Sequence, residues 1–288
     1  MKAAHSPMVS VIIPTYNRRH TILRAIESVL AQSFTDFEIL VVDDGSTDDT
    51  LETMAALTDD RIRVIRHASN RGAAAARNTG MRTARGEFIA WLDSDDEWLP
   101  DKIETQIMAL KCAQTDQKIC FSAYEIEEQE RFRIYHPAIP DRKQLFLGCD
   151  LSPGSTLVFN RSVLDTVGLL DERLRRYEDW DWLLRACKHF RLISIGLPLT
   201  RIHYSPHRSA AHVEASALQF IRKYKDELNR MGRYGRKVMA RPLFEVARYY
   251  AQEHKAAHAF SYLGKSLLTY PFHSPGAWLL LLGAWTGK

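Results

Sequence analysis

Short apolar runs and periodic segments alternate along the first hundred residues of the chain. The run at residues 9–13 is rich in β-branched residues, and further short apolar runs lie at residues 37–42, 62–65 and 88–91. Such runs are typical of strands in a parallel sheet that is covered on both faces. Residues 22–30 repeat apolar positions every three or four residues, and the alanine-rich residues 72–84 predict a tightly packed helix. The alternation predicts an α/β fold with a mainly parallel sheet flanked by helices.

Three of the predicted strands are followed directly by a polar motif. The motifs are PTYN at residues 14–17, DDGS at residues 43–46 and DSDD at residues 93–96. Ligands of parallel sheets bind beyond the carboxyl ends of the strands. We therefore expect the three motifs to converge on one binding site, although they lie far apart in the sequence.

The motif at residues 93–96 contains three carboxylates in four positions. A buried strand does not hold them without partners, so we expect them at its exit. Asp93 and Asp95 can both lean toward one cation, and oxygen ligands suit a divalent ion that takes its other ligands from water and phosphate. The alternative is that Asp95 or Asp96 caps a helix that begins near Pro100. Because a cap explains only one acid, the motif predicts a bound metal–diphosphate.

The second half of the sheet is predicted to be less regular. Apolar runs predict strands at residues 118–124, 132–135, 155–159, 192–195 and 199–203, with antiparallel or mixed pairing. A helix is expected within residues 176–190. Its first turn carries Glu178, Asp179 and Asp181, which the helix dipole stabilises, so a purely structural acidic turn is one interpretation.

The composition changes after Ser209. Residues 217–239 predict a single basic helix that carries Arg222, Lys223, Lys225, Arg230, Arg233, Arg236 and Lys237. This helix is either a solvated face or a surface for anionic lipid or a lipid diphosphate. Residues 244–250 and 256–270 predict a helical pair. The apolar segment 277–285 has nine residues, which is too short to span a bilayer, so it is expected to dip into an interface or to pack on the helices.

The overall charge and the cysteines exclude several classes of protein. The net charge of +4 is too small to indicate nucleic acid as a partner. The four cysteines have no CxxC spacing, so neither a zinc site nor a disulfide framework is predicted, and reduced thiols in the cytosol are expected. Residues 1–8 lack the apolar core of a signal peptide. We therefore expect a cytoplasmic protein, and no oligomeric state is indicated.

Several motifs, taken together and in order, resemble those of glycosyltransferase family 2. They are Pro14-Thr-Tyr-Asn17, Asp43-Asp-Gly-Ser46, Asn70-Arg-Gly72 with Ala76-Arg-Asn78, Asp93-Ser-Asp95 and Glu178-Asp179. The resemblance implies a Rossmann-like GT-A fold over residues 8–210, followed by a C-terminal helical appendage at residues 211–288. It also implies an inverting enzyme that uses a nucleotide-diphosphate sugar.

The resemblance implies a set of residues that bind the nucleotide sugar. They are Pro14, Tyr16, Asn17, Asp43, Asp44, Asn70, Arg77, Asp93 and Ser94. Tyr16 would stack on the base and Asp43 would accept hydrogen bonds from a uracil-like edge, so the donor is expected to be a UDP-sugar. Tyr16 could equally be a core aromatic residue, and Arg77 could be an ordinary solvated residue of a helix.

The reaction implied by the resemblance needs a metal and a base. Mn²⁺ or Mg²⁺ on Asp93 and Asp95 would neutralise the departing diphosphate, and His203 would be either a third ligand or a structural histidine. Asp179 would be the general base, with Glu178 or Asp181 as the alternative. A single in-line displacement would invert the anomeric carbon.

Two other classes of protein remain as alternatives. A nucleotidyltransferase that makes nucleotide sugars would need a glycine-rich basic loop after the first strand, whereas this chain has PTYNRR. A non-catalytic sugar-nucleotide-binding protein would not need intact acids at both sites. Release of a nucleoside diphosphate rather than pyrophosphate distinguishes these classes.

The acceptor is expected to be a glycan or a lipid-linked glycan of the bacterial cell surface. The basic segment and the apolar tail together predict peripheral contact with anionic lipid at the inner face of the cytoplasmic membrane. The QxxRW sequence of the family's processive members is absent, since residues 219–223 end in lysine where tryptophan would stand. One sugar is therefore expected per encounter.

Overall fold

The computed structural model describes residues 6–128, 131–203 and 209–271. The chain divides into two compact units. The sheet unit comprises residues 1–142, 149–173 and 178–205, and the helical unit comprises residues 143–148, 174–177 and 206–288. The predicted division into residues 8–210 and 211–288 stays a prediction. The two units are described separately below.

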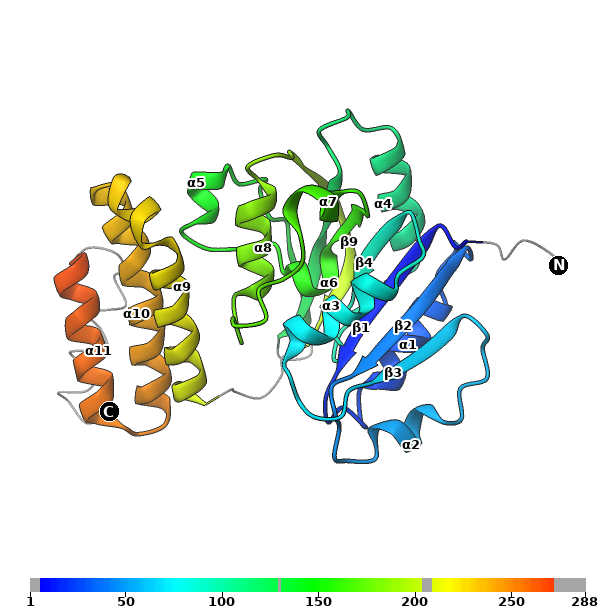
Figure 1. Ribbon diagram of the computed structural model, residues 1–288, viewed down its shortest axis with the longest axis horizontal. Helices are drawn as coiled ribbons and strands as arrows, with labels where there is room; N and C mark the ends of the chain where they lie inside the picture. The colour runs from blue at the N-terminus through cyan, green and yellow to red at the C-terminus, as the bar shows by residue number, and fades with distance from the viewer. Residues whose placement is uncertain (1–5, 129–130, 204–208, 272–288) are drawn as a thin grey trace. The chain divides into compact units, whose positions relative to one another are not determined.

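The first half of the sheet unit is parallel, as predicted. Its strands are β1 (Val9–Thr15), β2 (Phe37–Asp43), β3 (Ile62–Arg66) and β4 (Phe88–Trp91). They lie in the order β3-β2-β1-β4, and every pairing among them is parallel (Figure 1). In this register Thr15 lies opposite Asp43, so the loops after β1 and β2 leave the sheet at the same edge.

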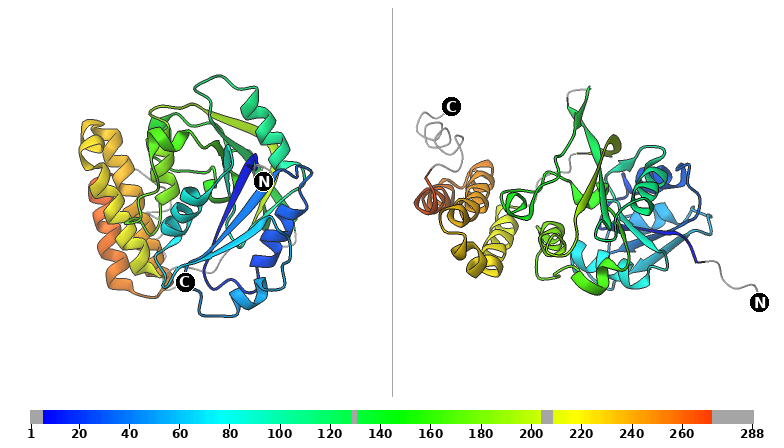
Figure 2. Two further views of the ribbon diagram at one scale, coloured as in Figure 1. Left: turned by 45° about the vertical axis from the view of Figure 1, so that its right-hand side comes forward. Right: turned by 90° about the horizontal axis from the view of Figure 1, so that it is seen from above.

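The second half of the sheet mixes both directions, as predicted. Its strands are β5 (Glu97–Trp98), β6 (Ile119–Glu128), β7 (Arg131–Tyr135), β8 (Val158–Asn160) and β9 (Leu192–Ile202). β8 is antiparallel to β4 and β6, β9 is parallel to β6, and β7 forms a hairpin with β6. This hairpin extends beyond the rest of the sheet (Figure 2, right). The described strands form one mixed, mainly parallel sheet.

Helices cover both faces of the parallel half. The helices of the sheet unit are α1 (Ile22–Leu30), α2 (Thr50–Met54), α3 (Ala73–Thr83), α4 (Lys102–Lys111), α6 (Pro153–Thr156), α7 (Val163–Val167) and α8 (Glu178–Ala186); α5 (Arg142–Leu145) lies at the boundary of the two units. Alternate residues of a strand face opposite sides, and Val11 belongs to the core that includes Ile26 of α1 and Ile103 of α4. Ile12 faces α3, where a Cβ on Gly80 would lie 2.4 Å from it. This glycine therefore permits close packing of α3.

Two predicted strands differ from the structure. Residues 155 and 156 were expected in a strand, but they end α6, and β8 begins only at Val158. The hydroxyl of Thr156 donates a hydrogen bond to the carbonyl of Leu151, which holds this short turn. Residues 192–195 and 199–203 were expected as two strands but form β9, which is irregular opposite Ala123.

The proposed cap of the helix near Pro100 is wrong. That helix, α4, begins at Lys102 and has Asp101 at its N-cap position. Neither Asp95 nor Asp96 occupies that position. The acids at residues 93–96 therefore do not cap this helix.

The helical unit contains three long helices that run side by side: α9 (Ala210–Arg230), α10 (Arg233–Gln252) and α11 (Ala256–Thr269) (Figures 1 and 2). The single basic helix predicted at residues 217–239 is wrong, because α9 ends before Gly232. This glycine has a φ of 58°, which favours glycine and reverses the chain. A Cβ on Gly235 would lie 1.8 Å from the carbonyl oxygen of Leu228, so glycine there permits the close approach of α10 to α9. The basic residues are divided between two helices.

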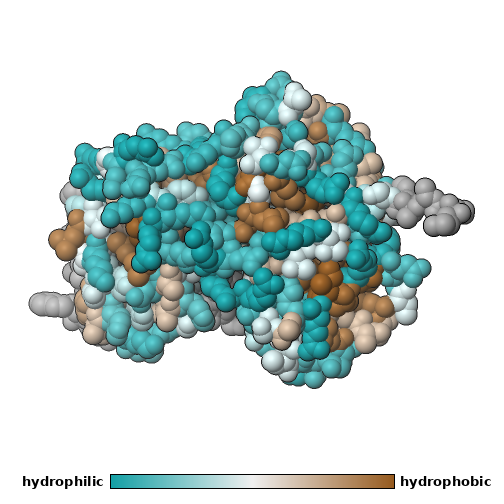
Figure 3. All heavy atoms as spheres, in the orientation of Figure 1, coloured by the Kyte–Doolittle hydropathy of each residue, from teal (hydrophilic) through white to brown (hydrophobic). Residues whose placement is uncertain are grey.

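None of the helices in the described ranges is long and apolar enough to cross a membrane. The predicted apolar tail at residues 277–285 lies outside the described residues. The face of the helical unit that Figure 3 displays is mostly hydrophilic, with scattered apolar residues.

Candidate active site

The loops that follow β1 and β2 are joined by hydrogen bonds. Asn17 has a φ of 52°, and its backbone amide donates to the hydroxyl of Ser46 at 2.9 Å. Its side-chain oxygen accepts from the amide of Thr47 at 2.8 Å. One residue further on, the amide of Arg18 donates to Thr50 at 2.8 Å. The PTYN and DDGS motifs therefore meet at one edge of the sheet, as the sequence predicted.

Asp43 and Tyr16 differ in exposure at this edge. The side chain of Asp43 is fully buried, and both of its oxygens accept the amide of Ser46 at 3.2 Å. Arg66 lies 3.6 Å from the same carboxylate. Tyr16 is 41% exposed, so its ring is not a core aromatic residue. The contact of Asp43 with a base stays a prediction.

Asp44 organises the loop that leads into α3. Its carboxylate accepts hydrogen bonds from His67 at 2.7 Å, from the amide of Arg71 at 3.0 Å and from the amide of Gly72 at 2.6 Å. Gly45 beside it has a φ of 77°, and a Cβ there would lie 2.8 Å from the backbone of Ser69. Asp44 therefore positions the loop, and Asn70 within that loop is exposed. Pro14 lies buried in β1.

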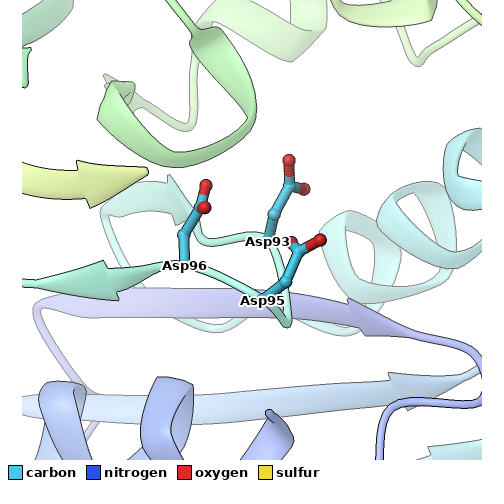
Figure 4. Close-up of side chains that lie close together, drawn as sticks. All are labelled: Asp93, Asp95 and Asp96. Atoms are coloured by element: carbon cyan, nitrogen blue, oxygen red, sulfur yellow. The ribbon is translucent and has the colours of Figure 1, made fainter. Parts of the chain in front are cut away.

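The acids after β4 form a cluster. Ligand atoms of Asp93, Asp95 and Asp96 all lie within 4.8 Å of one another. Figure 4 shows the three side chains leaving one tight loop, with their carboxylates directed to the same side of it. Ser94 between them is buried. Three carboxylate oxygens at this spacing fit a divalent cation, because hard oxygen ligands are those that Mg²⁺ and Mn²⁺ prefer.

The members of the cluster have different surroundings. Asp95 pairs with Arg18 at 3.1 Å, and Arg24 donates to its carbonyl oxygen. Asp96 is buried and accepts hydrogen bonds from the hydroxyl of Ser155 and from the amide of His203, the latter at 2.9 Å. Burial and the neighbouring Asp93 raise the pKa of Asp96 well above its usual value. The acids of the cluster therefore differ in their partners and in their burial.

Arg77 links this cluster to the first turn of α8. Its guanidinium is almost completely buried, and it donates to Asp93 and, at 3.0 Å, to Glu178. Burial alone would lower the pKa of Arg77, but the two carboxylates raise it, so the guanidinium stays charged. Trp91 lies beneath it, with 5.7 Å between the ring centroid and the guanidinium carbon. The structure therefore brings together residues that are a hundred positions apart.

Asp179 and Asp181 have different environments, although both lie in the first turn of α8. Burial and the neighbouring Glu178 raise the pKa of Asp179 to about 6, although the charge of Arg77 opposes the shift. Asp181 is fully buried, and Arg185 donates to it at 3.0 Å. Arg185 also donates to the carbonyl of Leu169 at 2.8 Å. Asp181 therefore pairs within its own helix, whereas Asp179 has the raised pKa that suits a base.

His203 is not a member of the acidic cluster found among the described residues. Its Nε2 lies 3.2 Å from Glu97, and Arg201 pairs with the same carboxylate at 2.7 Å. Burial alone would raise the pKa of Glu97, but the hydrogen bonds from Arg201 and His203 lower it. The role of His203 as a metal ligand stays a prediction.

Several residues of this site were not found from the sequence. Arg18 and Arg24 pair with Asp95, and Ser155 accepts the amide of Asp93 at 3.0 Å while donating to Asp96. None of them belongs to a charged or glycine-rich motif. Arg18 follows β1, Arg24 lies in α1 and Ser155 lies in α6. The folding of these elements brings the three residues to the site, and no periodic pattern in the sequence predicts those contacts.

Comparison with protein families and curated sequences gives the following matches. The model of the family described as "Glycosyl transferase family 2" matches residues 10–168, which is more than half of the chain. The chain is 34% identical over 237 residues to the uncharacterized glycosyltransferase RP339 of Rickettsia prowazekii, covering 77% of this chain and 70% of that protein. It is 48% identical over 105 residues to WfgD of Escherichia coli, a UDP-Glc:alpha-D-GlcNAc-diphosphoundecaprenol beta-1,3-glucosyltransferase, covering 36% of this chain and 42% of that protein.

Solved structures also resemble the chain. Staphylococcus aureus TarS 1–349 in complex with UDP-GlcNAc matches with a TM-score of 0.63 and 20% identity, covering 91% of this chain and 81% of that chain. The mannosyltransferase PcManGT of Pyrobaculum calidifontis, in complex with GDP-Man and Mn²⁺, matches with a TM-score of 0.62 and 17% identity. The match covers 98% of this chain and 81% of that chain. At these identities the likeness shows the fold alone, and the fold is the predicted GT-A arrangement.

Proposed function

The chain belongs to glycosyltransferase family 2, and from this membership we propose that it transfers a sugar, with inversion, from a UDP-sugar to a hydroxyl group of a lipid-linked glycan. The observation that carries the proposal is the network from Asp95 and Asp93 through Arg77 to Glu178. In this network one guanidinium contacts both the predicted metal cluster and the turn that carries the predicted base, which supports the proposal. A metal–diphosphate and an acceptor hydroxyl need that juxtaposition.

The donor is proposed to lie along the edge formed by the loops after β1 and β2. Tyr16 is exposed and would stack on the base, and Asp43 beside it would accept hydrogen bonds from uracil. Asn17 and Asn70 come from loops held in place by Ser46 and Asp44. UDP is preferred because a TarS structure binds UDP-GlcNAc and WfgD uses UDP-Glc. These relatives support the donor class and leave the sugar open.

Each end of the network has its own part in the proposed reaction. A divalent cation, when bound, would neutralise the negative charge that develops on the departing diphosphate. Asp93 and Asp95 would hold that cation, and the PcManGT complex with Mn²⁺ supports manganese. Asp179 would take the proton of the acceptor hydroxyl, because a pKa of about 6 lets the carboxylate be ionised at neutral pH yet still accept a proton. Arg77 would keep the metal cluster and the turn that carries the base at a fixed distance, because it contacts both Asp93 and Glu178.

The acceptor is proposed to be a lipid-linked glycan of a cell-surface polysaccharide, as it is for WfgD. The family of the chain and the exposed basic residues of α9 and α10, among them Arg222 and Arg236, support an enzyme that works at an anionic membrane surface from the cytoplasmic side. Co-sedimentation with liposomes at low and high salt tests this. If neither anionic lipid nor salt changes the bound fraction, the membrane assignment is wrong.

The enzyme is proposed to add one sugar per encounter, because the QxxRW sequence of processive members is absent. A ladder of long products from one acceptor would contradict this. The main proposal is tested by incubating the protein with a panel of UDP-, GDP- and dTDP-sugars, with and without Mn²⁺, and measuring nucleoside diphosphate and pyrophosphate separately. We expect UDP to be released only with Mn²⁺ or Mg²⁺. Release of pyrophosphate would indicate a nucleotidyltransferase, and release of neither would indicate a binding protein.

A further inference from the structure

The helical unit contains a segment that does not belong to its long helices. Residues 174–177 are grouped with residues 206–288, although in the sequence they directly precede α8. The next residue along the chain is Glu178, which pairs with Arg77, and Asp179 follows it. The segment therefore joins the helical unit covalently to the turn that carries the proposed base.

One carboxylate of α10 holds this segment through both of its oxygens. Oε1 of Glu245 accepts from Arg176 at 2.6 Å, and Oε2 accepts from the hydroxyl of Tyr177. Arg176 also donates to the hydroxyl of Tyr249 at 3.3 Å. Burial alone would lower the pKa of Arg176, but Glu245 raises it. The guanidinium of Arg176 therefore keeps its charge at neutral pH.

Tyr177 has a backbone conformation that residues other than glycine rarely adopt. Its φ is 67°, a left-handed value that is costly for a residue other than glycine and persists only where the surroundings enforce it. Here the ring packs edge-on against Phe220 with centroids 5.7 Å apart, and the hydroxyl is held by Glu245. Tyr177 is the last residue before α8, so this strained residue directly precedes the turn that carries Glu178 and Asp179.

We propose that Glu245 is a positioning residue for the reaction: by holding Arg176 and Tyr177, the helical unit fixes the turn that presents the base. The inference rests on the proposed function, because it takes Asp179 as the base. It goes beyond that function in giving the C-terminal helices a part in turnover. Small displacements of a catalytic group lower the rate steeply, so the contact is expected to affect turnover more than nucleotide binding.

The chain offers a matched control for Glu245. Glu214 of α9 also accepts hydrogen bonds through both oxygens, from the hydroxyls of Tyr250 and Tyr262. It lies in the same unit, and the two tyrosines that it holds belong to α10 and α11. Glu214→Ala therefore perturbs the helical unit without releasing the segment.

The experiment compares Glu245→Ala, Glu245→Gln and Glu214→Ala in the full chain. For each variant we would measure turnover with the best UDP-sugar, the Kd of UDP with Mn²⁺, and amide hydrogen exchange at residues 178–182. We expect Glu245→Ala to lower kcat by about ten- to a hundredfold, to leave the Kd of UDP within about twofold, and to speed exchange at residues 178–182. Glu245→Gln keeps one acceptor oxygen for Tyr177, so it should be intermediate. Glu214→Ala should change neither kcat nor this exchange.

Equal losses of kcat in Glu245→Ala and Glu214→Ala would overturn the inference, because the effect would then be general destabilisation. If the wild-type protein releases UDP from no donor, the proposed function fails, and hydrogen exchange alone decides the positioning role. Faster exchange at residues 178–182 in Glu245→Ala than in Glu214→Ala supports that role. Equal exchange in the two variants contradicts it.

Discussion

Two regions of the sheet unit use their carboxylates in opposite ways. In the loop edge, formed by residues 14–18, 43–50 and 67–72, Asp43 and Asp44 are buried and accept hydrogen bonds from backbone amides. In the acidic centre, formed by Asp93, Asp95, Asp96, Arg77, Glu178 and Asp179, like charges lie close together, and the buried guanidinium of Arg77 pairs with Asp93 and Glu178. There the pKa values of Asp96 and Asp179 are raised.

The difference suggests that the carboxylates of the loop edge mainly stabilise the fold, whereas those of the acidic centre serve the reaction. Carboxylates that accept amides stabilise the fold, because losing them leaves buried donors without partners. Carboxylates held close to one another destabilise the fold until a cation or a proton joins them, and groups of that kind are characteristic of functional sites. Substitutions in the loop edge should therefore lower stability most, whereas substitutions in the acidic centre should lower turnover most.

The largest effect on turnover is expected from Asp179→Asn. A general base contributes about 10²- to 10⁴-fold, so kcat should fall by that factor while UDP binding is retained. Steady-state kinetics and calorimetry with UDP measure the two quantities. Asp181→Asn is the comparison, because Asp181 pairs with Arg185 inside α8. If Asp181→Asn is inactive and Asp179→Asn is active, the base has been assigned to the wrong residue.

The next largest effect is expected from Asp95→Ala. Losing a ligand of the cation removes several kcal/mol of transition-state stabilisation, which corresponds to about 10²- to 10³-fold in turnover. The free energy of unfolding should change by less than about 1 kcal/mol, because the pair that Asp95 forms with Arg18 is partly exposed. Kinetics and urea unfolding check both. Full activity of Asp95→Ala at ordinary metal concentration would contradict the metal site.

The pH dependence separates the two regions further. Because Asp179, the proposed base, would act when ionised and its pKa is about 6, kcat/KM should fall about tenfold per pH unit below that value. The folded-state pKa of this acid is raised, so its ionisation costs stability as the pH rises from its ordinary value of 3.8 to about 6. Asp179→Asn should therefore have a higher Tm than the wild type at pH 7.5, by a margin that shrinks at pH 4.5. An equal margin at both pH values would contradict the raised pKa.

In the loop edge the expected effect is on stability. Asp44→Ala removes the acceptor for His67 and for the amides of Arg71 and Gly72, and the free energy of unfolding should fall by about 2–4 kcal/mol. Asp44→Asn keeps one oxygen for Gly72 and should lose less. Urea unfolding measures both variants. A loss from Asp44→Ala no larger than the loss from Asp95→Ala would remove the contrast between the two regions.

The sequence predicted the parallel half of the fold and the convergence of its loops. Runs such as residues 9–13 report burial on both faces of a sheet, and parallel strands end at one edge, so PTYN, DDGS and DSDD had to meet. The turn at Gly232 was missed because the apolar spacing continues through it. The spacing of apolar residues does not reveal a chain reversal that depends on the backbone conformation of one residue, Gly232.

The partners of the acids could not be predicted. Arg18, Arg77 and Ser155 contact the cluster from β1's loop, α3 and α6, and no local pattern specifies which acid each one meets. The contact of Asp44 with the donor stays a prediction, and its hydrogen bonds to the loop before α3 were not foreseen. Such assignments depend on the fold as a whole, because polar side chains select their partners only after the sheet has formed.

The central claim is that the acidic centre is built to hold a divalent cation with a diphosphate. Electron paramagnetic resonance of Mn²⁺ tests it directly, by titrating wild-type protein and Asp95→Ala with and without UDP. We predict that the wild type binds one Mn²⁺ more tightly in the presence of UDP and that Asp95→Ala loses this binding while remaining folded. Equal binding by both proteins, or no binding by the wild type even with UDP, would contradict the claim.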